Sequence, residues 1–90
     1  MDADEVVRTL LAYAQREGEA DQFWLDWAQQ WVSGDRSPDY AVTASRFAST
    51  PTGMIAARLA AAVARARTPR EIAEAQAWAQ FELKRRRLDS

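Results

Sequence analysis

The sequence predicts an all-α protein, a compact bundle of four to five short helices forming a single helical domain over residues 1–90. Three observations predict this class. Apolar residues recur at the three- and four-residue spacing of a helix face, no strand-like alternation occurs, and helix-start signals recur along the chain. The expected helices cover residues 3–17, 20–33, 38–48, 51–67 and 69–87.

The first expected helix, 3–17, follows Asp2, which has Glu5 three residues later, as in a capping box. Its apolar stripe consists of Val6, Val7, Leu10, Leu11 and Ala14. Gly18 favours a stop, although one longer helix bent at Gly18 is an alternative. The second helix, 20–33, ends at Gly34 and carries three tryptophans on one broad face, so we expect it to lie at the centre of the core. These are Trp24, Trp27 and Trp31.

The last three expected helices each begin at a hydroxyl residue followed by proline. This pair places an N-cap side chain before a residue whose missing N–H costs nothing in the first turn. The pairs are Ser37-Pro38, Thr50-Pro51 and Thr68-Pro69. In helix 51–67 we expect a core stripe of Ile55, Leu59, Val63 and Ala66. Its opposite face has only small residues, so another helix can approach closely there: Ala57, Ala60, Ala61 and Ala64. The stripe of helix 69–87 is Ile72, Ala75, Ala79 and Leu83.

The composition argues against catalysis. The chain has no cysteine and no histidine, so it lacks thiolate chemistry and the commonest general base and metal ligands. Its three glycines are scattered and form no phosphate-binding loop. We therefore expect a protein that is not an enzyme, with no catalytic residue, no cofactor, no metal and no small-molecule substrate.

Targeting signals are also missing from the sequence. The amino terminus is acidic, and no uninterrupted apolar segment reaches the length needed to cross a membrane. The expectation is a cytoplasmic protein with no membrane partner.

Charge is divided unequally along the chain. Residues 1–45 contain three arginines and nine acidic residues, net −6, whereas residues 46–90 contain nine basic and four acidic residues, net +5. The total of −1 therefore conceals an acidic half and a basic half. Candidates to contact phosphate or an acidic partner are Arg58, Arg65, Arg67, Arg70, Lys84, Arg85, Arg86 and Arg87. The last four have a second explanation, since cations at a helix C-terminus stabilise the helix dipole.

Trp78 and Phe81 lie away from the core stripe of their helix, with Glu74 and Arg85 beside them. Either the pair is buried against a second neighbour, or it forms an exposed partner-binding anchor of the composition found in interface hot spots. Antiparallel or parallel self-pairing of this helix would bury it, so a homodimer is among the expected partners.

These observations favour a non-enzymatic protein–protein interaction or regulatory module, such as an adaptor, an assembly subunit or an inhibitor of a larger complex. Its partner is another protein or a second copy. The alternative is a small nucleic-acid-binding regulator that uses the arginine-rich surface of the last two helices. The hypothesis of a DNA-binding helix-turn-helix is less favoured, since only Thr52 and Arg58 near the start of helix 51–67 offer hydrogen-bond donors to base edges.

Overall fold

The structure, a computed structural model, describes residues 1–35 and 49–88, and all regular secondary structure in these ranges is helical. The helices are α1 (Ala3–Arg16), α2 (Gln22–Val32), α4 (Pro51–Arg65) and α5 (Pro69–Arg85). The all-α prediction is therefore confirmed for the described residues. The helix expected over residues 38–48 lies outside them.

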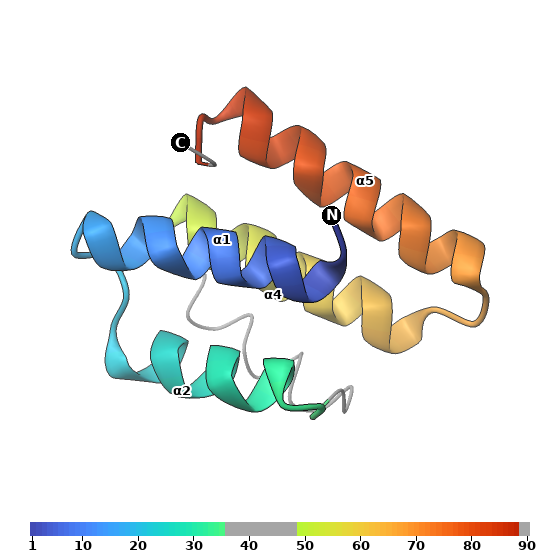
Figure 1. The fold of residues 1–90 in the computed structure, drawn as a ribbon, viewed down its shortest axis with the longest axis horizontal. Coiled ribbons are helices and arrows are strands. Elements are labelled where there is room, and N and C mark those ends of the chain that lie inside the picture. Colours follow the sequence, from blue (N-terminus) through green and yellow to red (C-terminus); the bar gives the residue numbers. More distant parts are fainter. Residues whose placement is uncertain (36–48, 89–90) are drawn as a thin grey trace.

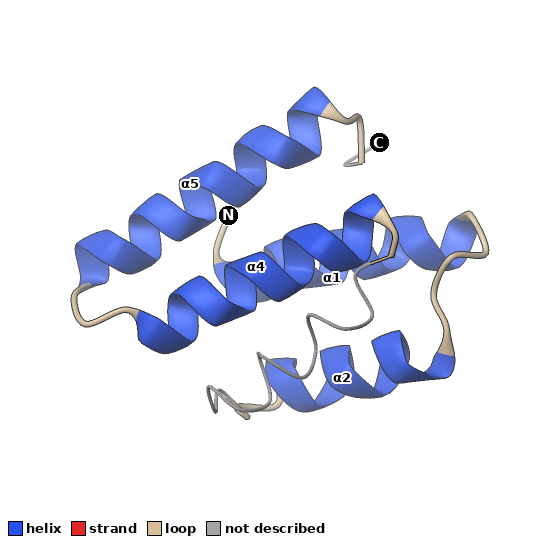
Figure 2. Cartoon of the chain, turned by 180° about the vertical axis from the view of Figure 1, so that it is seen from behind, coloured by secondary structure: helices blue, strands red, loops and turns tan. Residues whose placement is uncertain are grey.

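The helices pack around α1 and α4, which lie side by side in the middle of the molecule (Figure 1). The helix α1 packs against each of the other three, and α4 also packs against α5. Seen from behind, α5 lies on one side of this central pair and α2 on the other (Figure 2). This arrangement leaves one face of α5 without a neighbouring helix among the described residues.

Side chains fix the start of every described helix. Asp2, Asp21, Thr50 and Thr68 each accept a hydrogen bond from the backbone amide three residues later. Such a cap contributes about 1 kcal/mol to stability. The caps at Asp2, Thr50 and Thr68 were predicted. The cap at Asp21 was not, and it moves the start of the second helix from the expected residue 20 to Gln22.

The helices end one or two residues earlier than predicted, at residues 16, 32, 65 and 85. Three of them end in a turn that contains a residue of left-handed backbone conformation. This residue allows the backbone amide of the next residue to donate a hydrogen bond to a carbonyl in the last helical turn. The left-handed residues are Gly18, Gly34 and Arg87. The bent single helix considered for residues 3–33 is therefore wrong, because the Glu19 amide bonds to the carbonyl of Ala14 at 2.8 Å and closes α1. The helix α4 ends because Ala66 adopts an extended conformation that leads into the next cap.

The core combines the three tryptophans of α2 with apolar residues of α1, α4 and α5, and of the expected stripes Ala66 and Ile72 are only half buried and lie outside this cluster. Trp24, Trp27 and Trp31 are each only 1% exposed. The Trp24 and Trp27 rings meet edge to face at 5.8 Å, and Trp27 stacks on Trp31 at 5.9 Å. The alanine face of α4 is buried at Ala57 and Ala60, whereas Ala61 and Ala64 are half buried, so the prediction of this face as a packing surface holds only in part.

Candidate functional site

A groove of about 630 Å³ lies between α4 and α5. Its lining consists of Arg58, Ala61, Ala62, Arg65, Glu71, Glu74, Ala75 and Trp78. Four of these residues were expected to bind a partner, but as two separate surfaces: Arg58 and Arg65 as a basic surface, Glu74 and Trp78 as an aromatic anchor. The packing of α4 against α5 brings both sets into one groove.

The α4 wall of the groove presents two guanidinium groups over a floor of methyl groups. Arg58 and Arg65 are seven residues apart, which is two helical turns, and both are exposed. The guanidinium carbon of Arg58 lies 5.0 Å from the centroid of the Trp78 ring, a cation–π distance. Between them Ala61 and Ala62 are short enough to leave the groove open.

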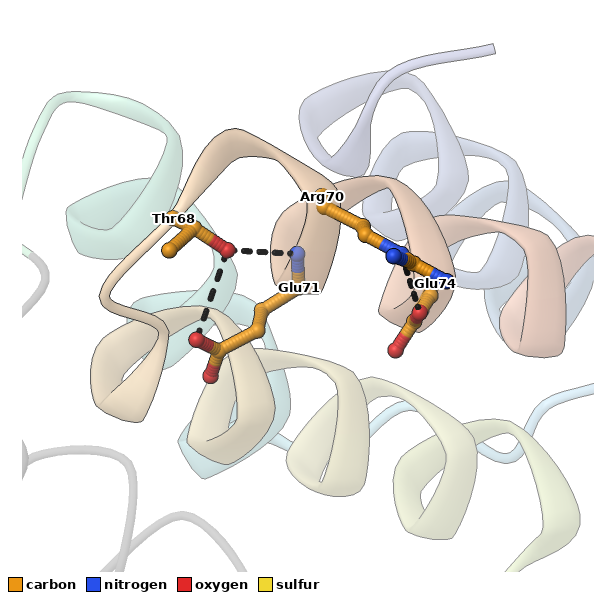
Figure 3. A network of polar contacts seen from close by, with 4 residues as sticks. All are labelled: Thr68, Arg70, Glu71 and Glu74. Atoms are coloured by element: carbon orange, nitrogen blue, oxygen red, sulfur yellow. Dashed lines mark hydrogen bonds and ion pairs between the residues drawn. The ribbon is translucent and has the colours of Figure 1, made fainter.

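The α5 wall contains the carboxylates of Glu71 and Glu74, which form hydrogen bonds with residues near the N-terminus of α5 (Figure 3). The Thr68 hydroxyl donates to the Glu71 carboxylate at 3.4 Å and accepts a hydrogen bond from the Glu71 amide at 3.3 Å, so Thr68 forms the predicted N-cap of α5. Arg70 donates to Glu74 at 3.2 Å. The negative charge of Glu74 is thus offset locally, and the positive charge of the opposite wall remains available to a bound partner.

Trp78 and Phe81 differ in burial. Trp78 is half buried, packing on the core on one side and lining the groove on the other. Phe81, one turn further along α5, is 61% exposed. The sequence left open whether this pair belongs to the core or to an interface; the structure shows Trp78 partly packed on the core and Phe81 exposed. An exposed phenylalanine next to a half-buried tryptophan is typical of a binding anchor.

The C-terminal basic block is separate from the groove and partly compensated. Arg85 and Arg86 both donate to one carboxylate oxygen of Glu82, at 2.8 and 2.9 Å. Hydrogen bonds from Arg86 and then from Arg85 lower the pKa of Glu82 below its ordinary value. Lys84 and Arg87 are exposed beside this cluster. The predicted set of eight basic residues is therefore divided, with Arg58 and Arg65 in the groove, Arg67 and Arg70 exposed near the α4–α5 connection, and the block at the far end of α5.

Some site residues were not predicted. Glu71 and Ala62 were not singled out as site residues, Ala61 was assigned to close helix packing, and Ala75 was assigned to the core stripe of its helix. A sequence signal could have identified them. Arg58 and Trp78 lie at similar distances along the chain from the connection between two consecutive helices, so antiparallel packing of these helices places the two residues opposite each other. A second groove of about 340 Å³, between α1 and α2, was also missed. Its lining is mainly apolar: Val7, Arg8, Leu11, Leu25, Ala28, Gln29 and Val32.

The fold and the groove define a small all-helical protein whose most distinctive surface is a cleft between two helices. Comparison of the chain with protein-family models, with curated proteins and with solved structures finds no match. Over residues 1–35 and 49–88, no helix is both long enough and apolar enough to cross a membrane. In the same ranges, no three His, Cys, Asp or Glu side chains are grouped so that they could hold a metal ion.

Proposed function

We propose that this protein is a non-enzymatic protein–protein interaction or regulatory module of the cytoplasm, which binds a partner, either another protein or a second copy of the chain, at the groove between α4 and α5. Adaptors, assembly subunits and inhibitors of larger complexes are members of this class. The proposal includes the finer fold prediction of a compact bundle of four to five helices.

The observation that carries the proposal is the juxtaposition of Arg58 and Trp78 at one open groove, with the exposed ring of Phe81 one helical turn beyond Trp78 on α5. Tryptophan and arginine are the residue types that contribute most often to interface hot spots, because each offers a large contact area and directional interactions. The alanine floor lets an approaching side chain reach the helix backbones. A partner that covers Phe81 would remove its exposed ring from water and gain the corresponding hydrophobic free energy.

Site-specific photocrosslinking in the protein's own cells tests this proposal. A photoreactive benzoylphenylalanine replaces Phe81, and a matched control carries the same group at Ala12, an exposed position on α1. We expect illumination to give a discrete protein adduct from position 81 and none from position 12. The adduct should disappear when Arg58→Glu is added, because the charge of the groove wall is then reversed.

Two outcomes of the crosslinking experiment would contradict the proposed function. Absence of any protein adduct at position 81, in a chain whose helix content is unchanged by circular dichroism, contradicts the proposed interaction. Equal labelling at positions 81 and 12 also contradicts it, since nonspecific contacts do not distinguish two exposed helix positions.

The alternative function, nucleic-acid binding by the basic surface of α4 and α5, is supported by the net charge of +5 carried by residues 49–88. The contacts of Glu82 with Arg85 and Arg86 weaken this support, because they compensate part of the C-terminal block. We therefore place this function second and test it through its salt dependence, as argued in the Discussion.

A further inference from the structure

The helix α5 carries a second stripe of residues besides the one that packs on the core. Its members recur with alternating spacings of three and four, the pattern by which two helices pack against each other. They are Glu71, Glu74, Trp78, Phe81 and Arg85. All are exposed except the half-buried Trp78, whereas Ala79 and Leu83 on the core stripe are buried. The second stripe is thus a helix-packing surface on the face of α5 that has no helix against it in the described chain.

We propose that the partner bound at this surface is a second copy of the chain, whose α5 pairs with the first in antiparallel orientation. This inference rests on the proposed interaction function and names its partner. The two-fold axis passes between Ala79 and Gln80. Residues at equal distances from that point then lie opposite each other, so Glu74 meets Arg85 of the second copy and Trp78 meets Phe81 of the second copy.

Charge complementarity selects the antiparallel orientation. With the axis at this position, each of the two Glu74 carboxylates faces a guanidinium, and the stripe is complementary to itself. Parallel pairing in register would instead place Glu74 against Glu74 and Arg85 against Arg85, and like charges directly opposite are destabilising. The ion pairs that these residues make inside one chain, Arg70 with Glu74 and Arg85 with Glu82, are on the surface and easily exchanged.

The aromatic residues give the pairing its apolar centre. Phe81, 61% exposed in the single chain, would lie against Trp78 of the second copy, and the reverse contact follows from symmetry. The incoming helix also covers the open side of the groove, where Arg58 already lies over Trp78. A 17-residue helix is about 25 Å long, so the contact is below the usual size of a stable interface. We therefore expect weak, concentration-dependent dimerisation.

Charge reversal tests the pairing by sedimentation velocity over a range of concentrations. Glu74→Arg alone and Arg85→Glu alone should each weaken dimerisation at least about ten-fold, because each creates two like-charge pairs. An equimolar mixture of the two variants should associate again, since every pair in the mixed dimer is of opposite charge. The double variant Glu74→Arg/Arg85→Glu should dimerise like the native chain.

Cysteine crosslinking tests the register, and the natural absence of cysteine makes each introduced thiol unique. Mild oxidation of a mixture of Glu74→Cys and Arg85→Cys chains should give the mixed disulfide dimer, in which one ion pair between positions 74 and 85 remains. Neither variant alone should crosslink, and Ala12→Cys serves as the control. Efficient crosslinking of each variant with itself would overturn the antiparallel register, and a chain that stays monomeric at all concentrations would overturn the pairing.

The photocrosslinking at position 81 separates failure of this inference from failure of the proposed function. An adduct with twice the mass of the chain supports the homodimer. An adduct with a different protein, in a chain that is monomeric in solution, overturns the homodimer and leaves the interaction function in place. Absence of every adduct overturns both.

Discussion

The contact between Arg58 and Trp78 is the residue-scale feature that joins the two walls of the groove. Arg58 is exposed and Trp78 is half buried, so the guanidinium lies over the ring while remaining in contact with water. An exposed cation–π pair contributes about 0.5–1 kcal/mol. The pair therefore holds α4 and α5 together modestly and fixes the shape of the groove more than the stability of the fold.

A double-mutant cycle measures this contact. Arg58→Met keeps the aliphatic stem and removes the charge, and Trp78→Leu removes the ring. We expect urea unfolding of the four chains to give a coupling free energy of about 0.5–1 kcal/mol. As a control, Arg65→Met changes the other groove arginine, which makes no ring contact within the described residues, and should change stability by less than about 0.5 kcal/mol. A coupling energy of zero would mean that the contact is not maintained in solution.

The lowered pKa of Glu82 gives a pH-dependent prediction. Its folded pKa is lowered, first by the hydrogen bond from Arg86 and then by that from Arg85. A carboxylate of this kind stabilises the fold above its unfolded pKa, and the stabilisation is lost as the pH falls through the folded pKa. Glu82→Gln should therefore lower the melting temperature at neutral pH.

Melting temperatures measured over a range of pH values test this role of Glu82. The difference in melting temperature between the native chain and Glu82→Gln should shrink as the pH falls below the ordinary glutamate pKa of about 4.3, where the unfolded chain begins to take up the proton, and should be lost as the pH falls through the lower folded pKa. Glu74→Gln is the matched control, because the Arg70–Glu74 pair is more exposed than the Glu82 pairs. An undiminished difference in acid would show that Glu82 acts by packing and not by charge.

At the scale of elements, the sequence predicted helix starts better than helix ends. A start depends on one side chain bonding to a nearby amide, so three of the four caps could be recognised from residue type and spacing. An end depends on backbone conformation. Gly18 and Gly34 were recognisable, but the left-handed residue after α5 is Arg87, which gives no such signal. Its turn brings Leu88 back onto the core, where it is only 5% exposed.

Gly18 provides a prediction about how α1 ends. It has φ +70°, and a Cβ placed there would meet nothing within 4 Å, so the effect of a substitution comes from backbone strain alone. Gly18→Ala should destabilise the fold by about 1 kcal/mol in chemical unfolding. Glu17→Ala, at the preceding exposed position with negative φ, should have little effect. Equal effects at the two positions would contradict the assignment of strain to Gly18.

The small-residue face of α4 provides a second element-scale prediction. Ala60 is 0% exposed in the core that α4 shares with its neighbours, so it has no room for a larger side chain. Ala60→Leu should destabilise the fold by about 1–3 kcal/mol through overpacking. Ala73→Leu, on the exposed side of α5, should change stability by less than about 0.5 kcal/mol. A neutral Ala60→Leu would indicate that α4 is loosely packed.

At the scale of the whole molecule, the sequence singled out several residues that line the groove but did not predict that they meet there. Arg58 and Trp78 were each singled out, one from charge and the other from its position away from the core stripe. Their contact depends on the rotation of α4 relative to α5, which is set by long-range packing of both helices on α1. Helical periodicity fixes the faces of one helix but not the relative rotation of two, so the groove could not be derived from it.

The charge distribution of the whole chain provides the last prediction, which concerns nucleic acid. Residues 1–35 carry a net charge of −6 and residues 49–88 carry +5, so any polyanion that approaches the basic half also meets the field of the acidic half. We therefore expect only weak binding to labelled duplex DNA in fluorescence anisotropy, with a dissociation constant no better than the nonspecific range of about 10⁻⁴ to 10⁻⁶ M at physiological salt. If the C-terminal block instead contacts phosphates, replacing Lys84, Arg85, Arg86 and Arg87 with glutamine should reduce the salt slope by up to about four units. Tight, saturable binding with that loss of slope would make nucleic-acid binding the better assignment, whereas an unchanged slope means that the block serves the helix end and not a nucleic acid.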